Sequence, residues 1–148
     1  MSNTLSKSHP KLTFKDVLTS SGRYPDREKH PECTYEVILN AQKTIAQVNK
    51  LLDRIGAFHR NAAPSISSGF RPSDVNAATQ KAATCSAHLT GEAVDLVDKD
   101  GYISKCIRAS GTDLLTQYDL YMEDESSTPG WCHLTIRPPK SGKRIFKP

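Results

Sequence analysis

The strongest pattern in the chain is a set of apolar residues at three- and four-residue intervals in TYEVILNAQKTIAQVNKLLDRIGAF, residues 34–58. This spacing puts the apolar residues on one face of a helix, and Gly56 follows as a stop signal. The stretch therefore predicts an amphipathic helix that packs on the core. Shorter patterns of the same kind predict a helix in 12–23 that ends before Gly22, and another in 72–82.

Apolar and polar residues alternate farther along the chain, which is the period of a half-buried strand. We expect strands in four stretches, PSISSGF (64–70), EAVDLVD (92–98), QYDLYME (117–123) and GWCHLTI (130–136). The polar loop DESSTP joins the last two stretches into a predicted hairpin. The fold class expected is α+β, with N-terminal helices packed on a mainly antiparallel sheet.

Two segments between the expected strands are harder to assign. Asp100 and Gly101 predict a tight turn of the kind that connects paired strands. The stretch KCIRASGTDLL, residues 105–115, is compatible with either a strand or a helix.

The length of 148 residues fits one domain, 1–148, with a flexible leader at 1–11 and a flexible basic tail at 138–148. With 36% hydrophobic and 24% charged residues the composition is that of a soluble globular protein. No apolar run approaches the roughly 20 residues of a membrane-spanning helix, so we expect no membrane partner.

The first residues, MSNTLSKSHPKLTF, lack the apolar segment of a secretory signal, so we expect the chain to be made in the cytosol and to stay there unless another factor releases it. The cysteines show no C-x-x-C pair, and in a cytosolic chain they are expected to be reduced thiols. They are Cys33, Cys85, Cys106 and Cys132.

The net charge of +4 is a mild excess and does not indicate a nucleic-acid partner. Much of the excess lies in the last residues, where no acid accompanies Arg137, Lys140, Lys143, Arg144 and Lys147. Two readings of this segment stay open. It is a solvated tail, or it attracts an anionic polymer such as a cell wall.

A candidate metal site is present in the second half of the chain. Zinc takes nitrogen from histidine and oxygen from aspartate, and a catalytic site leaves one position open for water. His88 precedes a turn at Gly91, Asp95 lies in the expected strand beyond it, and His133 lies in the last expected strand. Composition and period permit a metal site here, but a lone histidine in a strand is more often structural.

Four ordered blocks carry a resemblance to a known family. The blocks are SSGFRPSDVNAAT, SAHLTGEAVDLVD, YDLYMED and GWCHLTI. They resemble, in order and separation, the zinc D-alanyl-D-alanine carboxypeptidase family, which includes VanX-type dipeptidases, phage L-alanyl-D-glutamate endolysins and the zinc-bearing signalling domain of hedgehog proteins. The resemblance covers roughly residues 12–137 and implies the Hedgehog/DD-peptidase fold.

The resemblance also implies a set of functional residues. His88, Asp95 and His133 would bind one zinc ion per chain. Arg71 matches the arginine that faces the carboxylate or carbonyl of the substrate, a task that suits its planar guanidinium. Ser86 matches a residue that hydrogen-bonds the substrate backbone.

The general base is where this sequence departs from the best-known members. VanX-type enzymes have an acid three residues before the last histidine, but here that position is Gly130. Other branches place a glutamate at the end of the preceding strand, and Glu123 of YDLYMED matches it. We expect Glu123 to take a proton from the attacking water, with Asp124 or Glu125 as alternatives.

These resemblances imply a zinc metallopeptidase that cleaves a peptidoglycan stem peptide, either as a D-Ala-D-Ala carboxypeptidase or as an L-Ala-D-Glu endopeptidase. We expect a monomeric bacteriophage lysis enzyme, an endolysin held in the host cytoplasm before release to the cell wall, or a virion-associated enzyme. The alternative is a catalytically inactive zinc-binding structural or recognition module of the same fold, which Gly130 permits.

Overall fold

The computed structural model describes residues 8–19, 24–79 and 86–148. In chain order its helices and strands are α1 (Phe14–Val17), η1 (Arg27–Lys29), α2 (Tyr35–Arg54), η2 (Ala57–His59), β1 (Ile66–Ser68), α3 (Ser73–Ala78), η3 (Ala87–Thr90), β2 (Ala93–Val97), α4 (Tyr102–Ala109), α5 (Asp113–Gln117), β3 (Tyr121–Glu123), η4 (Glu125–Ser127), β4 (Trp131–Thr135) and β5 (Ile145–Phe146), where η denotes a 3₁₀ turn.

Helix α2 is the long helix expected from the apolar periodicity, and it is confirmed. It begins where the Thr34 side chain accepts a hydrogen bond from the Val37 amide, and it is followed by Gly56, whose φ of +71° few other residues adopt readily. Its apolar face is buried along its whole length, at Val37, Ala41, Ile45, Val48, Leu51 and Leu52.

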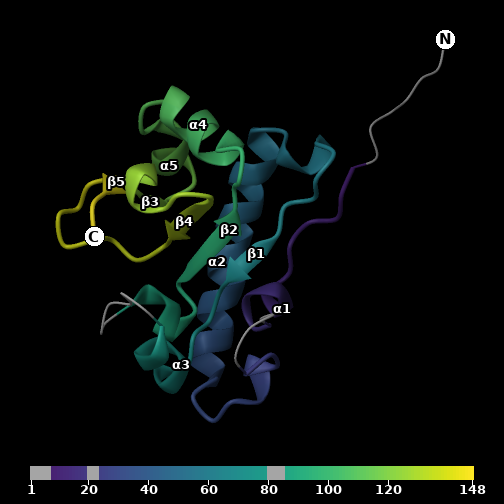
Figure 1. Cartoon of the computed structure of the whole chain (residues 1–148), viewed down its shortest axis with the longest axis vertical. Coiled ribbons are helices and arrows are strands. Elements are labelled where there is room, and N and C mark those ends of the chain that lie inside the picture. The colour runs from purple at the N-terminus through teal and green to yellow at the C-terminus, as the bar shows by residue number, and fades with distance from the viewer. Residues whose placement is uncertain (1–7, 20–23, 80–85) are drawn as a thin grey trace.

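The five strands form one sheet in the order β1-β2-β4-β3-β5. All neighbouring pairs are antiparallel except β3 with β5, which is parallel. Helix α2 crosses behind the sheet in Figure 1, and the residues that face it are buried: Val94, Leu96, Met122, Cys132 and Leu134. The α+β class and the mainly antiparallel sheet are confirmed, as is the hairpin of β3 and β4.

The Asp100–Gly101 turn does not connect two strands, which corrects the expectation from the sequence. It leads into α4, because the Asp98 carboxylate accepts hydrogen bonds from the amides of Ile103 and Ser104 at 2.9 and 3.0 Å. These amides lie in the first turn of the helix and have no partner within it. The ambiguous stretch 105–115 accordingly ends α4 and begins α5.

The C-terminal segment is only in part the flexible tail that the sequence predicted. Ile145 and Phe146 form β5 against Met122 and Glu123 of β3. The Arg144 guanidinium stacks over the Tyr121 ring, 4.3 Å from its centroid. The backbone pairing with β3 fixes this short strand, and a two-residue strand has too little alternation to be recognised in a sequence.

The described part of the N-terminal leader also contacts the domain. The His9 amide donates to the Phe58 carbonyl at 2.8 Å, and Lys11 pairs with Asp53 of α2 at 2.6 Å. The leader therefore contacts the domain from His9 onward, and its flexibility stays a prediction.

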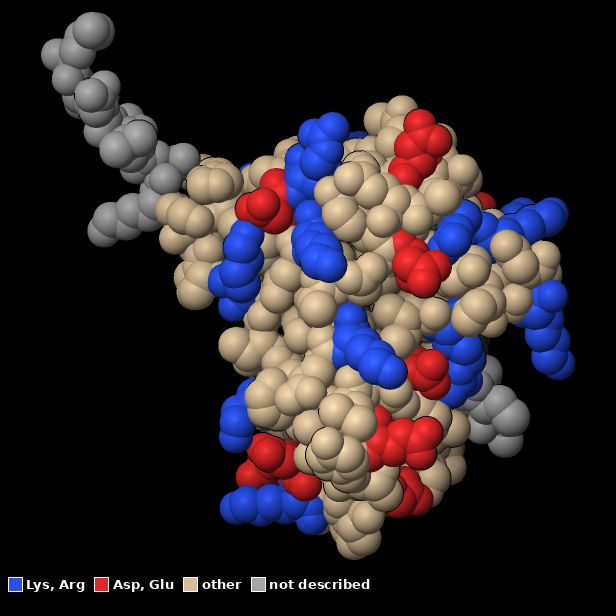
Figure 2. Space-filling view, turned by 180° about the vertical axis from the view of Figure 1, so that it is seen from behind, with Lys and Arg blue, Asp and Glu red and all other residues tan. Residues whose placement is uncertain are grey.

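Three cysteines lie in the described part of the chain, Cys33, Cys106 and Cys132, and all are free thiols, whereas Cys85 lies outside it. Among the described helices none is long and apolar enough to cross a bilayer. Figure 2 shows Lys and Arg interspersed with Asp and Glu on the face seen from behind. That face presents no large surface of one charge.

Candidate metal centre

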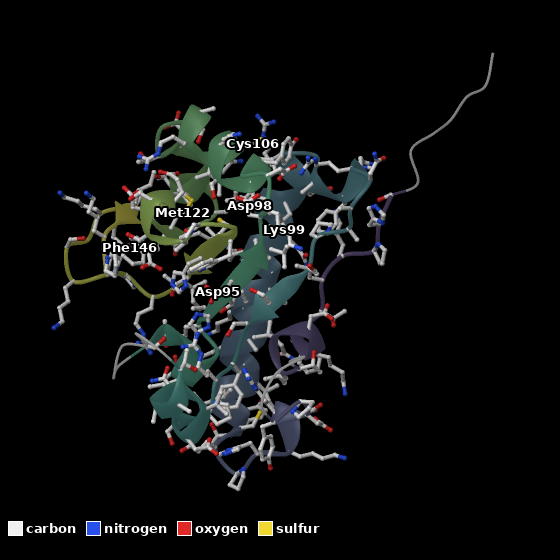
Figure 3. The ribbon with its side chains drawn as sticks, in the orientation of Figure 1. Asp95, Asp98, Lys99, Cys106, Met122 and Phe146 are labelled. Atoms are coloured by element: carbon white, nitrogen blue, oxygen red, sulfur yellow. The ribbon has the colours of Figure 1, made fainter. Side chains whose placement is uncertain are left out.

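Three elements bring the expected ligands to one point. His88 comes from η3, Asp95 from the middle of β2 and His133 from the middle of β4. Each offers one ligand atom, and these atoms lie within 4.8 Å of one another. The two Asp95 carboxylate oxygens lie 3.3 Å from His88 Nε2 and 2.8 Å from His133 Nδ1. Figure 3 shows Asp95 near the centre of the sheet.

The register of β2 and β4 explains two of these positions. Asp95 is paired directly with His133, and the neighbouring pair is Leu96 with Cys132. Since side chains alternate between the faces of a sheet, the buried Leu96 and Cys132 turn Asp95 and His133 to the opposite, open face. The pattern of GWCHLTI had predicted this orientation of His133, and the structure confirms it.

The ring of His88 is oriented by a backbone carbonyl. Its Nδ1 lies 2.7 Å from the Gly69 carbonyl oxygen, which can only accept a hydrogen bond, so Nδ1 carries the proton and Nε2 is free for a metal. The side chain is fully buried, and this burial lowers the pKa of the imidazole. His88 is therefore neutral at neutral pH, which is the form that binds metals.

Asp95 is held as a carboxylate. Burial alone would raise the pKa of its carboxyl, but the adjacent His88 and His133 outweigh burial and hold that pKa below its ordinary value. The Arg71 guanidinium lies 3.9 Å away and adds positive charge. The centre thus offers two imidazole nitrogens and a carboxylate oxygen.

The segment SGFR, residues 68–71, positions both His88 and Arg71. A Cβ on Gly69 would stand 2.3 Å from the Val17 carbonyl oxygen, so only glycine allows this close approach to α1. The Phe70 amide donates to the same carbonyl at 2.7 Å, and the Phe70 side chain is fully buried. The Arg71 amide donates to the His88 carbonyl at 2.9 Å.

The side chain of Arg71 is largely buried and hydrogen-bonded. Its side chain is 10% exposed, and its Nη1 and Nη2 donate to Asn76 Oδ1 and Ser68 Oγ at 3.2 and 3.4 Å. Burial lowers the pKa of the guanidinium, although the Asp95 carboxylate opposes that shift. Arg71 is therefore a fixed cation beside the metal centre.

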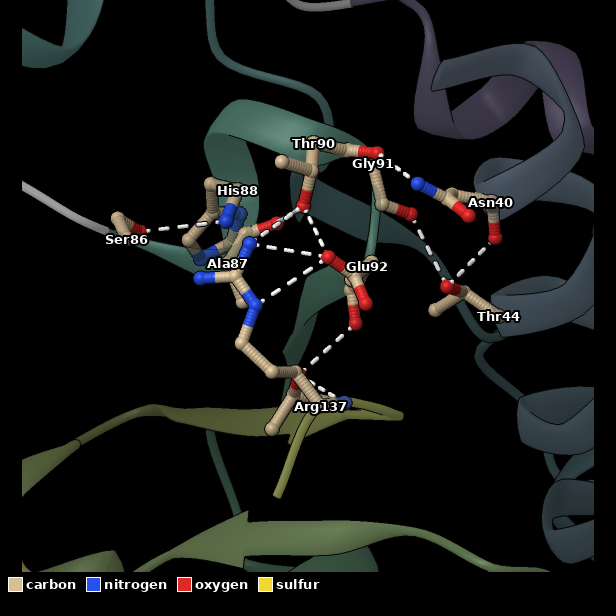
Figure 4. Close-up of polar contacts among 10 residues, drawn as sticks. Asn40, Thr44, Ser86, Ala87, His88, Thr90, Gly91, Glu92 and Arg137 are labelled. Atoms are coloured by element: carbon tan, nitrogen blue, oxygen red, sulfur yellow. Dashed lines mark hydrogen bonds and ion pairs between the residues drawn. The ribbon is translucent and has the colours of Figure 1, made fainter. Parts of the chain in front are cut away.

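The turn that carries His88 is anchored to helix α2, as Figure 4 shows. Thr44 donates to the Gly91 carbonyl at 3.0 Å, and Asn40 donates to the Thr90 carbonyl at 3.0 Å. Gly91 has a φ of +78°, and a Cβ there would stand 2.8 Å from the Val37 carbonyl oxygen. Both facts require a glycine in the tight turn between the first two ligands.

A second set of bonds ties the turn to β4. Arg137, just after β4, donates to Glu92 Oε1 at 2.9 Å and to Thr90 Oγ1 at 2.8 Å (Figure 4). At the start of the turn, the Ser86 hydroxyl accepts a bond from the His88 amide at 3.2 Å. Glu92 is thus part of the support of the turn that carries His88.

Glu123 lies close to two of the candidate ligands, His133 and Asp95. Tyr121 and Met122 pair with Thr135 and Leu134, so the next position in the register puts Glu123 opposite His133 on the open face. Burial is the main cause that raises the pKa of its carboxyl, and the charge of Asp95 acts in the same direction. Within the described residues its carboxylate makes no hydrogen bond or ion pair.

The two alternative acids are engaged elsewhere. Asp124 and Glu125 both pair with Arg108 of α4, and Asp124 also accepts bonds from the amide and hydroxyl of Ser126. Gly130 has a φ of +88°, which an acid in that place would adopt only with strain. Of the acids considered from the sequence, Glu123 is the one whose carboxylate adjoins the ligands without a partner.

A catalytic zinc site uses three protein ligands and leaves the fourth position open. The two imidazole nitrogens and the carboxylate oxygen fit this requirement, and an unpaired carboxylate lies beside them. The tautomer fixed by Gly69 and the ionised state of Asp95 supply the protonation states that zinc needs. The donor set therefore fits one bound metal ion.

Comparison with known proteins identifies the family. The family described as Peptidase M15 matches residues 20–128, well over half of the chain, so this chain belongs to the peptidase M15 family. Its members are peptidases, which implies a peptide substrate. The match includes His88, Asp95 and Glu123 and ends before His133, which the register of β4 brings to the site. No curated protein and no solved structure gives a significant match.

Sequence reasoning did not find three of the groups that build the site. They are the Gly69 carbonyl, the Arg137 side chain and Phe146, whose ring stands edge-on to His133 with centroids 6.1 Å apart. The glycine of the SGFR block was the available signal for the first. Nothing in the local sequence signals the other two contacts.

Proposed function

We propose that the protein is a zinc metallopeptidase that hydrolyses the stem peptides of peptidoglycan. One observation carries the proposal, namely that Glu123 lies beside the convergent His88, Asp95 and His133 with a free carboxylate and a raised pKa. A purely structural zinc site with these three ligands has no need of an adjacent fourth residue whose carboxylate is unbonded. Membership of the peptidase M15 family supports the same function.

The residues would divide the reaction among them. Zinc held by His88, Asp95 and His133 would polarise the scissile carbonyl and make water a better nucleophile. Glu123 takes the proton of the attacking water, and its raised pKa keeps that proton available for transfer to the leaving amine. The amine then departs protonated, and the other product is a carboxylate.

Arg71 and Ser86 would hold the substrate. The buried guanidinium of Arg71 supplies fixed positive charge beside the reacting carbonyl, which suits the negative charge that develops there. The Ser86 hydroxyl accepts from the His88 amide, which leaves its own proton to donate to a substrate carbonyl.

The biological setting is a proposal on the same basis. We propose that the hydrolase is a bacteriophage endolysin, held in the host cytoplasm until a separate factor releases it to the cell wall. A virion-associated enzyme that opens the wall during entry would use the same chemistry. The bond it cuts would be D-Ala-D-Ala or L-Ala-D-Glu.

One experiment tests the function directly. Purified peptidoglycan is digested with the protein, with and without a chelator, and the soluble fragments are identified by mass. We expect new stem-peptide termini that disappear with the chelator and return on addition of zinc. The masses identify the bond.

The second candidate is a zinc-binding recognition module without activity, and Gly130 favours it because the best-known enzymes have an acid there. Elemental analysis separates the two functions. A protein with one zinc per chain that releases no fragment from several peptidoglycan types would contradict the enzyme and establish the module.

A further inference from the structure

A cavity of about 550 Å³ opens at the end of the sheet nearest α4. It lies between α4, the loop that follows β2 and the connection from β3 to β4, and its lining includes Lys99, Arg108, Thr128 and Trp131. Figure 3 shows Asp98 and Lys99 between Asp95 and the helix α4. The cavity therefore adjoins the strands of the candidate metal centre, but its lining includes none of the three candidate metal ligands.

Trp131 connects the cavity to the metal centre. It lies two positions before His133 in β4, so both side chains are on the open face and their positions are about 7 Å apart along the strand. Val97 is paired directly with Trp131 on β2. Each of these two residues is 37% exposed, although both are apolar. Together they form an apolar platform, which we call the Trp131 platform.

Several charged groups around the cavity already have partners. Arg108 pairs with Glu125, Asp98 accepts the first amides of α4, and Asp100 pairs with Arg60 at 2.6 Å. A ligand that relied on ionic bonds would have to break these pairs. The cavity is better suited to a ligand that is neutral, polar at its edges and apolar on one flat side.

A hydroxyl in the cavity wall lacks a hydrogen-bond partner among the described residues. It belongs to Thr128, which is 2% exposed. An unsatisfied buried hydroxyl costs free energy, and a ligand that hydrogen-bonds to it would remove the cost. Lys99, at the exposed rim, can donate to a carbonyl or hydroxyl oxygen.

We propose that the Trp131 platform and this cavity bind a pyranose ring of the glycan strand to which the stem peptide is attached. A pyranose has an apolar face of C–H groups that stacks on an aromatic ring, and its hydroxyl and acetamido groups are neutral hydrogen-bonding partners. This proposal rests on the proposed function, because it assumes that the substrate is peptidoglycan.

The spacing also selects the bond. An extended peptide advances roughly 3.3–3.6 Å per residue. The distance of about 7 Å between the Trp131 platform and His133 therefore equals the length of about two residues of an extended peptide. The sugar is joined by its lactyl group to the first residue of the stem. A ring on the platform therefore places the bond after that first residue, L-Ala-D-Glu, near the metal ligands, whereas D-Ala-D-Ala lies several residues farther away.

Trp131 is the sole tryptophan of the chain, so its fluorescence reports directly on the platform. The test titrates the zinc-loaded protein with a tetramer of N-acetylglucosamine, which contains no peptide bond to cleave, and in parallel with the free stem peptide. We expect a saturable change in emission with the saccharide. No change with the saccharide, or a change with the stem peptide alone, would overturn the proposal.

Variants that keep the tryptophan sharpen the test. Thr128→Val and Lys99→Ala remove a polar partner from the cavity, and each should weaken saccharide binding by roughly three- to ten-fold. Tyr35→Ala is the control, since Tyr35 is 76% exposed on α2 and lines no part of the cavity. Equal affinities in all three variants would contradict the proposed site.

Hydrolysis provides a second readout. The KM for stem peptide still attached to a disaccharide should be lower than the KM for the free stem peptide. Trp131→Ala should raise the KM for the disaccharide-linked peptide roughly ten-fold, which brings it close to the KM for the free peptide. Trp131→Phe should restore part of the difference between the two KM values. A preference for glycan-linked substrate that survives Trp131→Ala would overturn the proposal.

These outcomes are separable from those of the proposed function. Saccharide binding without hydrolysis would contradict the peptidase and leave the platform intact. Hydrolysis with equal KM values for the free and the disaccharide-linked stem peptide, and with no fluorescence change, would contradict the saccharide site and leave the peptidase function intact.

Discussion

The turn that carries His88 and the strand that carries Glu123 stand on opposite sides of the same site and are fixed to different degrees. The His88 turn is bonded to α2, to Gly69 and to Arg137, and its ligand is fully buried. Glu123 ends a three-residue strand between β4 and the short β5, and its carboxylate is only half-buried. The comparison distinguishes a rigid half, the bonded turn that presents the candidate ligand His88, from a less constrained half, the carboxylate of Glu123.

The largest effect is expected from the rigid half. His88→Ala removes a ligand, so bound zinc should fall to background and hydrolysis should drop about a thousand-fold or more. Elemental analysis and fragment release measure the two losses. His59→Ala is the matched control, because His59 is exposed at the end of η2. Full zinc content in the His88 variant would contradict the assignment.

Glu123→Gln tests the other half. The amide keeps the size of the side chain but cannot take a proton, so hydrolysis should fall about 10²- to 10⁴-fold while zinc content stays unchanged. Asp124→Asn, on the neighbouring acid that pairs with Arg108, should retain most of the activity. If the two variants exchange these phenotypes, the base is Asp124.

Gly69→Ala measures how strictly the rigid half is packed. The added methyl would stand 2.3 Å from a backbone oxygen, and we expect the free energy of unfolding to fall by about 1–3 kcal/mol. Gly142→Ala is the control: its φ is also unusual at +70°, but no atom lies within 4 Å of the new methyl, so its cost should be at most about 1–2 kcal/mol. Denaturant unfolding compares them, and a Gly69 variant as stable as the unmodified protein would contradict the close approach.

The smallest effect is expected from the bonds between the His88 turn and β4. Arg137→Ala removes a partly exposed ion pair with Glu92, and the free energy of unfolding should fall by about 0.5–1 kcal/mol. Lys140→Ala, at an exposed position three residues on, should have no measurable effect. Thermal unfolding of the unmodified protein and the two variants in one buffer is sufficient to rank their stabilities.

The sequence was enough to predict what depends on local pattern. The period of α2 and the alternation in β2 and β4 are local, and alternation alone places His133 opposite the buried Cys132 and Leu134. The ligand set and Glu123 came from ordered motif blocks. The structure brings these residues together, while their chemical roles stay predictions.

What the sequence did not predict depends on contacts between distant segments. The Asp98 carboxylate accepts hydrogen bonds from residues five and six positions farther along the chain, which is outside the usual spacing of a helix cap. Strand β5 exists because β3 offers a free edge. No periodicity in a two-residue segment can signal that.

The direct pairing of Asp95 with His133 has a consequence for folding. The two residues are 38 positions apart in the chain, and His88 precedes both on a separate turn. A metal bound to all three would act as a removable cross-link between segments that the unfolded chain keeps far apart, and its binding free energy would add to the stability of the native state. The supply of that metal would then change the free energy of unfolding of the protein.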